Sequence, residues 1–340
     1  MNVMFMKSKY IQVLVVALML ISTAAAQDPH FSQYFSSPLT MNPANTGNFD
    51  GPSRLATNFR NQWAGIGEPF LTGTVSFDTE IFKDKIGNGN KLAVGVLGLY
   101  DKSSGGRLKS SYLGASVGYH LWLDRDKMKK LSIGFQATAV NRHLDYQNVT
   151  FADQFGSYGF DLNLPSNQTF QSGNIGYVDF NTGLMYTNDF ETGTMYAGVS
   201  MYHILQPKES FLGNEKNRVS SRFTFHTGAN WNVGEKGEIH GSALLMQQGT
   251  STEFALGLAY GKNIPSESND ITVYIGSWMR NKDAVIPYMG YKFNNLQLGI
   301  TYDATISTLN SASTKNRSFE VAVIYHFLDK TEYRRFVPWY

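Results

Sequence analysis

Hydrophobic and polar residues alternate along most of this chain with a period of two. Residues 131–140 (LSIGFQATAV) and 222–233 (RFTFHTGANWNV) show the pattern most cleanly. A period of two sends successive side chains to opposite faces of a β-strand. Comparable segments along the chain predict about fourteen strands of roughly ten residues each. They begin near Leu55, Leu71, Leu92, Tyr112, Leu131, Val178, Thr194, Arg222, Ile239, Phe254, Ile271, Val285, Leu296 and Ser318.

The polar face of these segments separates a membrane protein from a soluble one. It consists of Gly, Ser, Thr, Asn and Gln more than of the Lys and Glu that cover a soluble β-sandwich. In a transmembrane barrel the apolar face contacts lipid, and the small polar face lines an enclosed interior. We therefore predict an all-β fold, a transmembrane antiparallel β-barrel. A soluble sandwich or propeller is the alternative, although no repeat of about 40 to 50 residues is visible.

The gaps between the predicted strands support the barrel. With the mature N-terminus placed in the periplasm, even-numbered gaps should be short turns and odd-numbered gaps can be long outer loops. Residues 188–191 and 294–295 are short gaps of the first kind. The long gaps, residues 142–174, 204–219 and 304–316, all fall on the outer side.

Tryptophans near the expected strand ends fit an aromatic girdle at the lipid headgroups. These residues are Trp63, Trp122, Trp231 and Trp278. Only Trp231 is clearly in phase with the apolar face of its strand, so the girdle adds little support.

The first residues have the features of an export signal. Lys7 and Lys9 precede an apolar stretch, residues 11–21, that is too short for a comfortable membrane anchor, and residues 24–26 (AAA) fit a cleavage site. We expect a signal peptide at residues 1–26, cleaved near Ala26, and an outer-membrane location for the mature chain.

Composition narrows the function classes further. The chain has 29 Lys and Arg against 27 Asp and Glu, a net charge of +2, and no cysteine. This charge is too balanced for electrostatic nucleic-acid binding, and the lack of cysteine excludes disulfides and thiolate chemistry. The seven histidines are dispersed without metal-ligand spacing. We therefore expect no metal and no cofactor.

The segment that follows the signal differs from the rest of the chain. Residues 27–51 do not alternate and contain three prolines, which predicts an irregular segment over residues 27–53. Irregular backbone survives at membrane depth only inside protein or water, so we expect this segment to act as a plug in or beneath the barrel mouth. Residues 54–328 would form the barrel, and residues 329–340 a periplasmic tail.

Motifs at both ends of the mature chain resemble one family. Residues 27–34 (QDPHFSQY), 42–47 (NPANTG) and 60–63 (RNQW) are similar to the PorP/SprF outer-membrane proteins of the type IX secretion system of Bacteroidetes. Residues 302–305 (YDAT) and 317–321 (RSFEV) resemble the closing hairpin of that family. The resemblance spans nearly the whole mature chain, with its specific motifs concentrated in these two regions.

The chain departs from the family pattern in two places. Where the family often has Gly-Ser-His-Glu, this chain has Arg-Ser-Phe-Glu at residues 317–320, which retains Glu320 but removes any role for a histidine there. The chain also continues past the last strand, so the terminal aromatic residue often used in barrel assembly would be Phe327 and not Tyr340.

The resemblance implies a cell-envelope role without catalysis. Relatives are linked to the secretion or surface retention of proteins that carry a C-terminal sorting domain, and in gliding species some support surface adhesins. The implied partners are such a secreted surface protein, periplasmic type IX secretion or peptidoglycan-binding proteins, and the lipid bilayer.

Two regions are candidates for binding. Residues of the irregular segment would either bond to lumen groups as part of the plug or contact a partner; they are Asp28, His30, Phe31, Gln33, Tyr34, Asn42 and Pro43. Aromatic residues of the long outer loop would either recognise a partner or pack as a lid over the lumen; they are Phe151, Phe155, Tyr158 and Phe160.

Two other functions compete with surface anchoring. A barrel of this size could be a gated channel or transporter for small or hydrophobic solutes. It could also be a lipolytic enzyme, because His240 and Ser242 lie on the same face of one predicted strand. The enzyme is the weaker alternative, since the sequence offers no convincing third member of a triad.

Overall fold

The computed structural model describes residues 28–63, 69–83, 85–146, 151–156, 159–161, 163–164, 166, 173–214, 216–234, 236–264, 266, 269–306 and 317–327. The expected signal peptide at residues 1–26 and the expected tail at residues 329–340 lie outside this part. Within it, no helix has the length and apolar character needed to cross a membrane.

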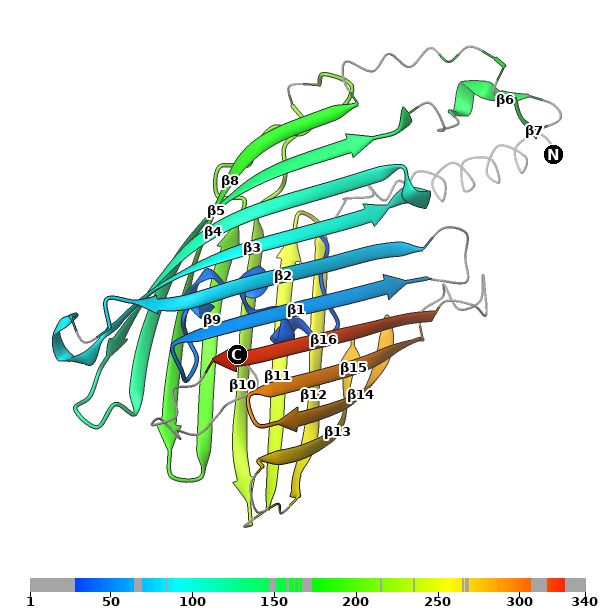
Figure 1. Cartoon of the computed structure of the whole chain (residues 1–340). Coiled ribbons are helices and arrows are strands. Elements are labelled where there is room, and N and C mark those ends of the chain that lie inside the picture. Colours follow the sequence, from blue (N-terminus) through cyan, green and yellow to red (C-terminus); the bar gives the residue numbers. More distant parts are fainter. Residues whose placement is uncertain are drawn as a thin grey trace, which may run out of the picture.

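Fourteen strands form a closed barrel in which neighbours pair antiparallel (Figure 1), as the sequence pattern predicts. The barrel closes where the first strand pairs with the last. The strands are β1 (Ser53–Gln62), β2 (Phe70–Ile81), β3 (Lys91–Ser103), β4 (Leu108–Trp122), β5 (Lys129–Leu144), β8 (Asn174–Phe190), β9 (Gly193–Tyr202), β10 (Arg222–Val233), β11 (Gly237–Gln248), β12 (Ser251–Ile264), β13 (Ile271–Arg280), β14 (Ala284–Phe293), β15 (Leu296–Thr305) and β16 (Arg317–Phe327).

Short elements lie in the connections between these strands. Single 3₁₀ turns occur at η3 (Gly87–Gly89), η4 (Ser104–Gly106) and η6 (Ala152–Gln154). The last of these leads into a small separate hairpin, β6 (Phe155–Gly156) and β7 (Gly159–Phe160).

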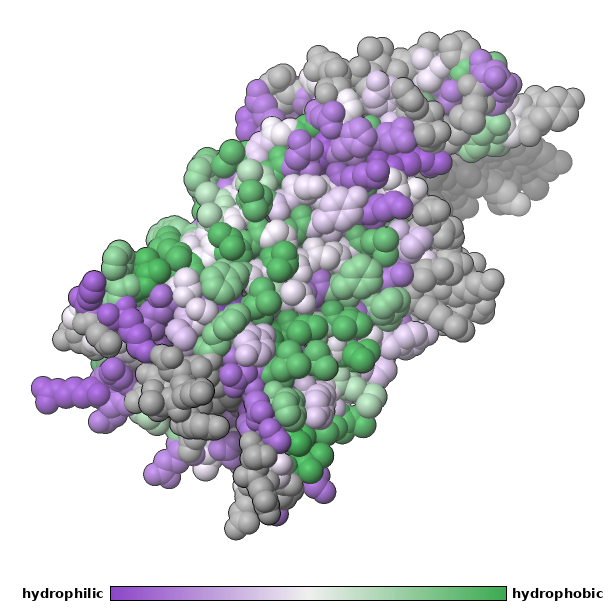
Figure 2. All heavy atoms as spheres, viewed as in Figure 1, coloured by the Kyte–Doolittle hydropathy of each residue, from purple (hydrophilic) through white to green (hydrophobic). Residues whose placement is uncertain are grey.

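The two faces of each strand are inverted relative to a soluble protein. In the middle of β5, over residues 131–139, the exposed residues are apolar, among them Phe135, whose side chain is 53% exposed, whereas the enclosed residues include Ser132 and Gln136. Figure 2 shows apolar side chains spread over the outer wall, with hydrophilic ones gathered towards its ends. An apolar exterior around a small, polar interior is what a strand in lipid requires.

The two ends of the barrel differ in their connections. At the end that we call the turn end, β8 and β9 are joined by two residues, as are β14 and β15. At the opposite end, the loop end, residues 145–173 separate β5 from β8 and residues 203–221 separate β9 from β10. The expectation that the long gaps share one end is confirmed, and barrels of this kind place such loops outside the cell.

The N-terminal segment, residues 28–52, fills the lumen and forms the expected plug (Figure 1). It contains three short helical elements, η1 (Tyr34–Ser36), α2 (Pro38–Met41) and η2 (Pro43–Asn45). Leu39, Asn42 and Thr46 are completely buried. The plug is therefore an integral part of the packed interior of the barrel.

The plug runs from the loop end to the turn end. Asp28 pairs with Arg222 at the loop-end start of β10, whereas the carbonyl of Asn45 accepts a hydrogen bond from Arg54 near the turn-end start of β1. Our expectation that the mature N-terminus starts on the periplasmic side was wrong as far as Asp28 is concerned. Because β1 begins at the turn end, a segment that also reaches Arg222 has to cross the whole lumen.

Aromatic side chains form an apolar core between the plug and the wall. The ring of Phe35 lies 4.9 Å from that of Trp278 and 5.8 Å from that of Tyr288. Trp278 is 1% exposed, so the suggestion that it belongs to an aromatic girdle at the lipid headgroups was wrong. Trp278 faces the lumen, where its ring packs against Phe35 and not against lipid.

Glycines in the wall let the plug backbone come close. Gly118 pairs with Gly134 across β4 and β5, and Gly134 pairs with Gly183 of β8, so the three form one row around the lumen. A Cβ atom at Gly134 would lie 2.1 Å from the carbonyl carbon of Pro43, and one at Gly118 would lie 2.3 Å from the carbonyl oxygen of Thr46. The row is the socket for η2.

Replacing Gly134 with alanine should destabilise the barrel, because the added methyl group collides with plug backbone. Overpacking of this kind costs about 1–3 kcal/mol. The measurement is the temperature at which the folded form is lost in heat-dependent electrophoresis. Gly241→Ala is the matched control, because a Cβ there would meet its nearest atom at 3.9 Å. Equal loss of stability in both variants would contradict the socket.

Candidate functional site

The first turn of the plug is bound at the seam that closes the barrel. The Glu320 carboxylate on β16 accepts hydrogen bonds from the backbone amides of Ser32 and Gln33, at 2.7 and 2.9 Å. It also accepts one from the side-chain amide of Asn58 on β1, at 2.7 Å. Glu320 is fully buried, so these donors replace water around its carboxylate.

A second buried acid ties the same turn to three strands. The carboxylate of Asp303 on β15 lies 3.0 Å from the guanidinium of Arg60 on β1 and 2.8 Å from that of Arg280 on β13. It accepts a hydrogen bond from the Ser32 hydroxyl at 2.7 Å, and Arg60 donates to the His30 carbonyl at 2.7 Å. Buried charges persist only when they are paired in this way.

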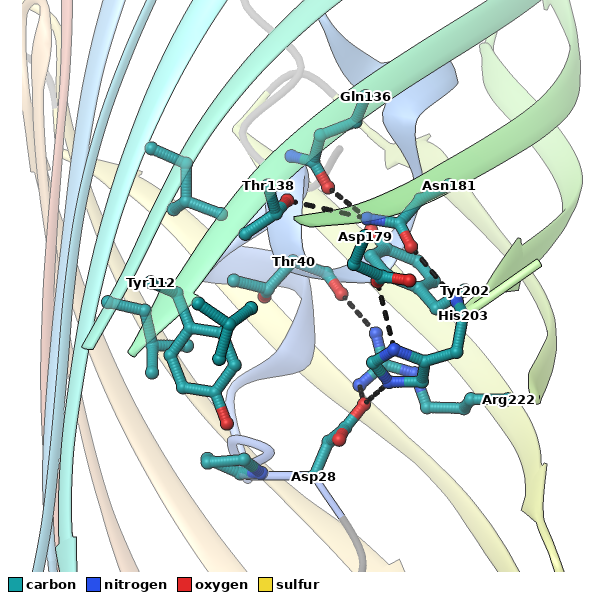
Figure 3. A pocket seen from close by; sticks show the side chains of 14 residues that line it. Asp28, Thr40, Tyr112, Gln136, Thr138, Asp179, Asn181, Tyr202, His203 and Arg222 are labelled. Atoms are coloured by element: carbon teal, nitrogen blue, oxygen red, sulfur yellow. Dashed lines mark hydrogen bonds and ion pairs between the residues drawn. The ribbon is translucent and has the colours of Figure 1, made fainter. Parts of the chain in front are cut away.

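The start of the plug is held by a cluster of charges at the loop end (Figure 3). The Asp28 carboxylate lies 2.6 Å from Nε2 of His203 and 3.1 Å from the guanidinium of Arg222. The other ring nitrogen of His203 lies 2.9 Å from the Asp179 carboxylate. His203 directly follows β9 with a left-handed backbone (φ 57°). Two acids and two bases thus pair with one another. We call these four residues, Asp28, Asp179, His203 and Arg222, the Asp28 cluster.

The Asp28 cluster changes the protonation of two of its members. Burial on its own would lower the pKa of His203, but Asp179 and Asp28 outweigh it and raise that pKa to about 9. Burial would raise the pKa of Asp28, yet Arg222 and His203 hold it well below its usual range. His203 and Asp28 are therefore both charged at neutral pH.

A small cavity of about 50 Å³ lies beside the Asp28 cluster. Its lining is mixed: Leu97, Val140 and Tyr112 contribute apolar surface, whereas Thr138 and Asn181 are polar (Figure 3). The space is large enough for a few water molecules.

The remaining plug residues predicted from the sequence also bond to the wall. The Tyr34 hydroxyl lies 2.8 Å from Oγ of Ser242, to which the Trp278 indole donates at 3.0 Å. His30 lies 2.9 Å from the carboxylate of Glu253. Ser242 is 7% exposed, and its hydroxyl is already hydrogen-bonded to both Tyr34 and Trp278. The structure therefore favours a structural role over a catalytic one.

Three further predicted residues complete the seating of the plug. The Asn42 side chain accepts from the Ala44 amide at 2.9 Å, which caps η2, and Pro43 occupies the first position of that turn. The same side chain donates to the carbonyl of Leu184 at 3.1 Å. Phe31 is 3% exposed. The expected turn at Asn42 and Pro43 is present.

The aromatic residues of the long outer loop form a separate surface. Phe155 and Phe160 face each other across the β6–β7 hairpin, with ring centroids 4.9 Å apart, and they are 63% and 56% exposed. Phe151 is half-buried and precedes η6. Tyr158 lies outside the described residues. This hairpin surface is open to solvent.

The sequence did not indicate His203, Arg222 and Asp303 as plug contacts, nor Asp179 as the partner of His203. Each stands on the polar, lumen-facing phase of its strand or directly after it, which was the only signal available. Their partners are up to 271 positions away in the chain. Among the described residues, no group of three or more acidic or histidine side chains could hold a metal ion.

Raising the pH above about 9 should loosen the start of the plug. The folded pKa of His203 lies above its ordinary value of 6.5, so its contribution is complete below pH 6.5 and disappears as the pH rises through 9. The loss is up to roughly 3 kcal/mol. Thermal stability measured from pH 6 to 10 should fall over this window in the wild type and stay flatter in His203→Gln. Identical profiles would contradict the role of His203.

Comparison with solved structures shows what the barrel is similar to. The toluene transporter TodX of P. putida matches with a TM-score of 0.50 at 9% identity, over 86% of this chain and 94% of that chain. The toluene transporter TbuX of Ralstonia pickettii has a TM-score of 0.48 at 11% identity, over 90% of this chain and 97% of that chain. At such identities the likeness concerns the fold alone. No curated protein matches the sequence.

The sequence itself matches one family over most of its length. Residues 23–325 match the family described as type IX secretion system membrane protein PorP/SprF. The matched range includes the plug and all but the last two residues of β16. This chain belongs to the PorP/SprF family of type IX secretion system membrane proteins, and it is an outer-membrane β-barrel.

Proposed function

We propose that this protein holds a secreted surface protein at the cell exterior by binding its C-terminal sorting domain at the loop end, without conducting solutes. The observation that carries the proposal is the filled lumen. The plug crosses the barrel from Asp28 to Asn45 and is bonded to the wall at both ends. A barrel closed in this way offers its rim and loops for interaction.

The exposed hairpin supplies a suitable contact at the rim. Phe155 and Phe160 present two aromatic rings to solvent on a short, hydrogen-bonded scaffold. Aromatic residues are the usual anchors of protein interfaces, because they bury a large apolar area at a small entropic cost. The opposite, turn end would face periplasmic secretion or peptidoglycan-binding proteins.

A gated channel is the competing function. The likeness to a toluene transporter concerns the fold, and the charged groups at Glu320, Asp303 and Arg222 would each lose buried partners if the plug left the lumen. Breaking a buried pair on one side costs about 3–5 kcal/mol. A plug held by several such contacts supports anchoring more than transport.

Replacing both exposed phenylalanines with serine should release the client. We expect Phe155→Ser combined with Phe160→Ser to lower surface retention by at least about tenfold, since an aromatic anchor is worth about 2 kcal/mol or more. The measurement compares surface proteins of deletion, variant and wild-type cells, and takes as client the protein lost in the deletion.

Phe82→Ser is the matched control for this experiment. Phe82 is also a phenylalanine with high exposure, 59%, but it lies at the turn end. Its replacement should leave the client on the surface. The anchoring proposal fails if deletion of the whole protein releases no surface protein.

A further inference from the structure

The rim of the barrel has a step between β8 and β9. β8 has 17 residues and β9 only 10. β9 covers β8 from Thr182 to Phe190, whereas β5 pairs with it from Asn174 onwards. A tilted strand needs about ten residues to span the membrane. The first residues of β8 therefore stand above the barrel mouth with a strand on one side only.

The backbone amides and carbonyls of this stretch face alternately towards β5 and away from it. The Gly173 carbonyl accepts a hydrogen bond from the Leu144 amide, on the β5 side. The Phe180 carbonyl accepts one from the Ile204 amide, on the opposite side. Because residues two apart in a strand point the same way, the amides and carbonyls of Gly176 and Val178 face away from β5. No described residue bonds to them there.

In the described residues of the loop that follows β9, the backbone bonds to this edge of β8 only through the Ile204 amide. Glu209 of that loop reaches the lumen side of the wall, where its carboxylate bonds to the Tyr177 hydroxyl at 2.9 Å and pairs with Arg142. Gly176 and Val178 are both exposed, the latter 55%. Within the described part of the chain, this edge is open to a molecule approaching from outside.

The free edge also lacks the residue types that usually protect such an edge. Natural sheets shield exposed edges with charges, prolines, bulges or covering loops, because unpaired edges recruit other strands. Residues 175–178 (IGYV) contain neither a charge nor a proline. An unguarded edge of this composition is suited to accept a strand.

A second copy of this chain is a poor occupant of the edge. Both copies sit in the membrane with the same orientation, and strands in such barrels are tilted by about 35–45°. Two β8 edges that face each other would therefore cross at about 70–90°, whereas paired strands differ by only about 20–25°. The geometry favours a partner that is free to orient itself.

From this step in the rim we propose that residues 175–178 of β8 bind an extended β-strand of a partner protein, which continues the sheet above the mouth. Main-chain hydrogen bonds from Gly176 and Val178 supply the contact. The inference rests on the proposed function in taking the client as the source of the strand, and it adds that recognition is by backbone pairing beside the aromatic hairpin.

Proline at position 178 tests the backbone contact. Val178→Pro removes an amide that points away from β5, so the ladder with β5 survives, as it does for proline on natural edge strands. Val178→Thr keeps the amide and changes the side chain. We expect the proline variant to lose surface retention of the client by about tenfold, and the threonine variant to retain it, with both migrating as folded barrels in unheated gels.

The outcomes separate the two proposals. Full retention in Val178→Pro, together with loss in the double phenylalanine variant, overturns the strand inference and leaves anchoring intact. A second measurement does not depend on surface retention, and it therefore tests the strand inference even if the anchoring proposal fails. Amide exchange of residues 174–180 should be slower in outer-membrane vesicles from wild-type cells than in purified protein in detergent, and equally fast exchange overturns the inference.

Discussion

The structure depends on the need to pair polar groups that lipid-facing strands enclose. A wall that presents apolar residues to lipid turns its polar residues inwards, where each one needs a hydrogen-bond partner. In this chain the N-terminal segment provides many of those partners. Glu320 receives two of its backbone amides, and Asp303 receives the Ser32 hydroxyl. The plug and the wall therefore supply hydrogen-bond partners to each other's buried polar groups.

This pairing links the two ends of the sequence. Glu320 and Asn58 stand on the last and first strands of the barrel, and both join the network around Ser32 and Gln33. The seam that closes the barrel is thus also the place where the plug is fixed. Opening the lumen would require the separation of charges that already satisfy one another, so the surfaces left for partners are the rim, the loops and the free edge of β8.

The sequence was most informative where a simple period controls the structure. A strand with lipid on one face repeats every two residues, and so the strand positions, the closed barrel and the inward phase of residues such as Ser132 and Gln136 could be predicted. The N-terminal segment could be placed in or beneath the barrel mouth, because irregular backbone at membrane depth has to be buried in protein or water. Asn42 and Pro43 could be assigned to a turn from their residue types alone.

Other features could not be predicted, because they depend on contacts between distant positions. The direction of the plug follows from the pairing of Asp28 with Arg222, and no local pattern encodes it. Tryptophan is typical of the aromatic girdle at the lipid headgroups, but Trp278 faces the lumen and packs against Phe35. The free edge of β8 results from the unequal lengths of β8 and β9, which became visible only when strand ends were fixed in space.

The protein's own N-terminal segment occupies the lumen, and the closed state of the barrel depends on it. The most direct test is conductance across a planar lipid bilayer, measured for the purified wild-type barrel and for a variant that lacks residues 28–50. We expect no conductance steps from the wild type and open-channel steps from the variant. Steady conductance from the wild-type protein, equal to that of the shortened variant, would contradict this expectation.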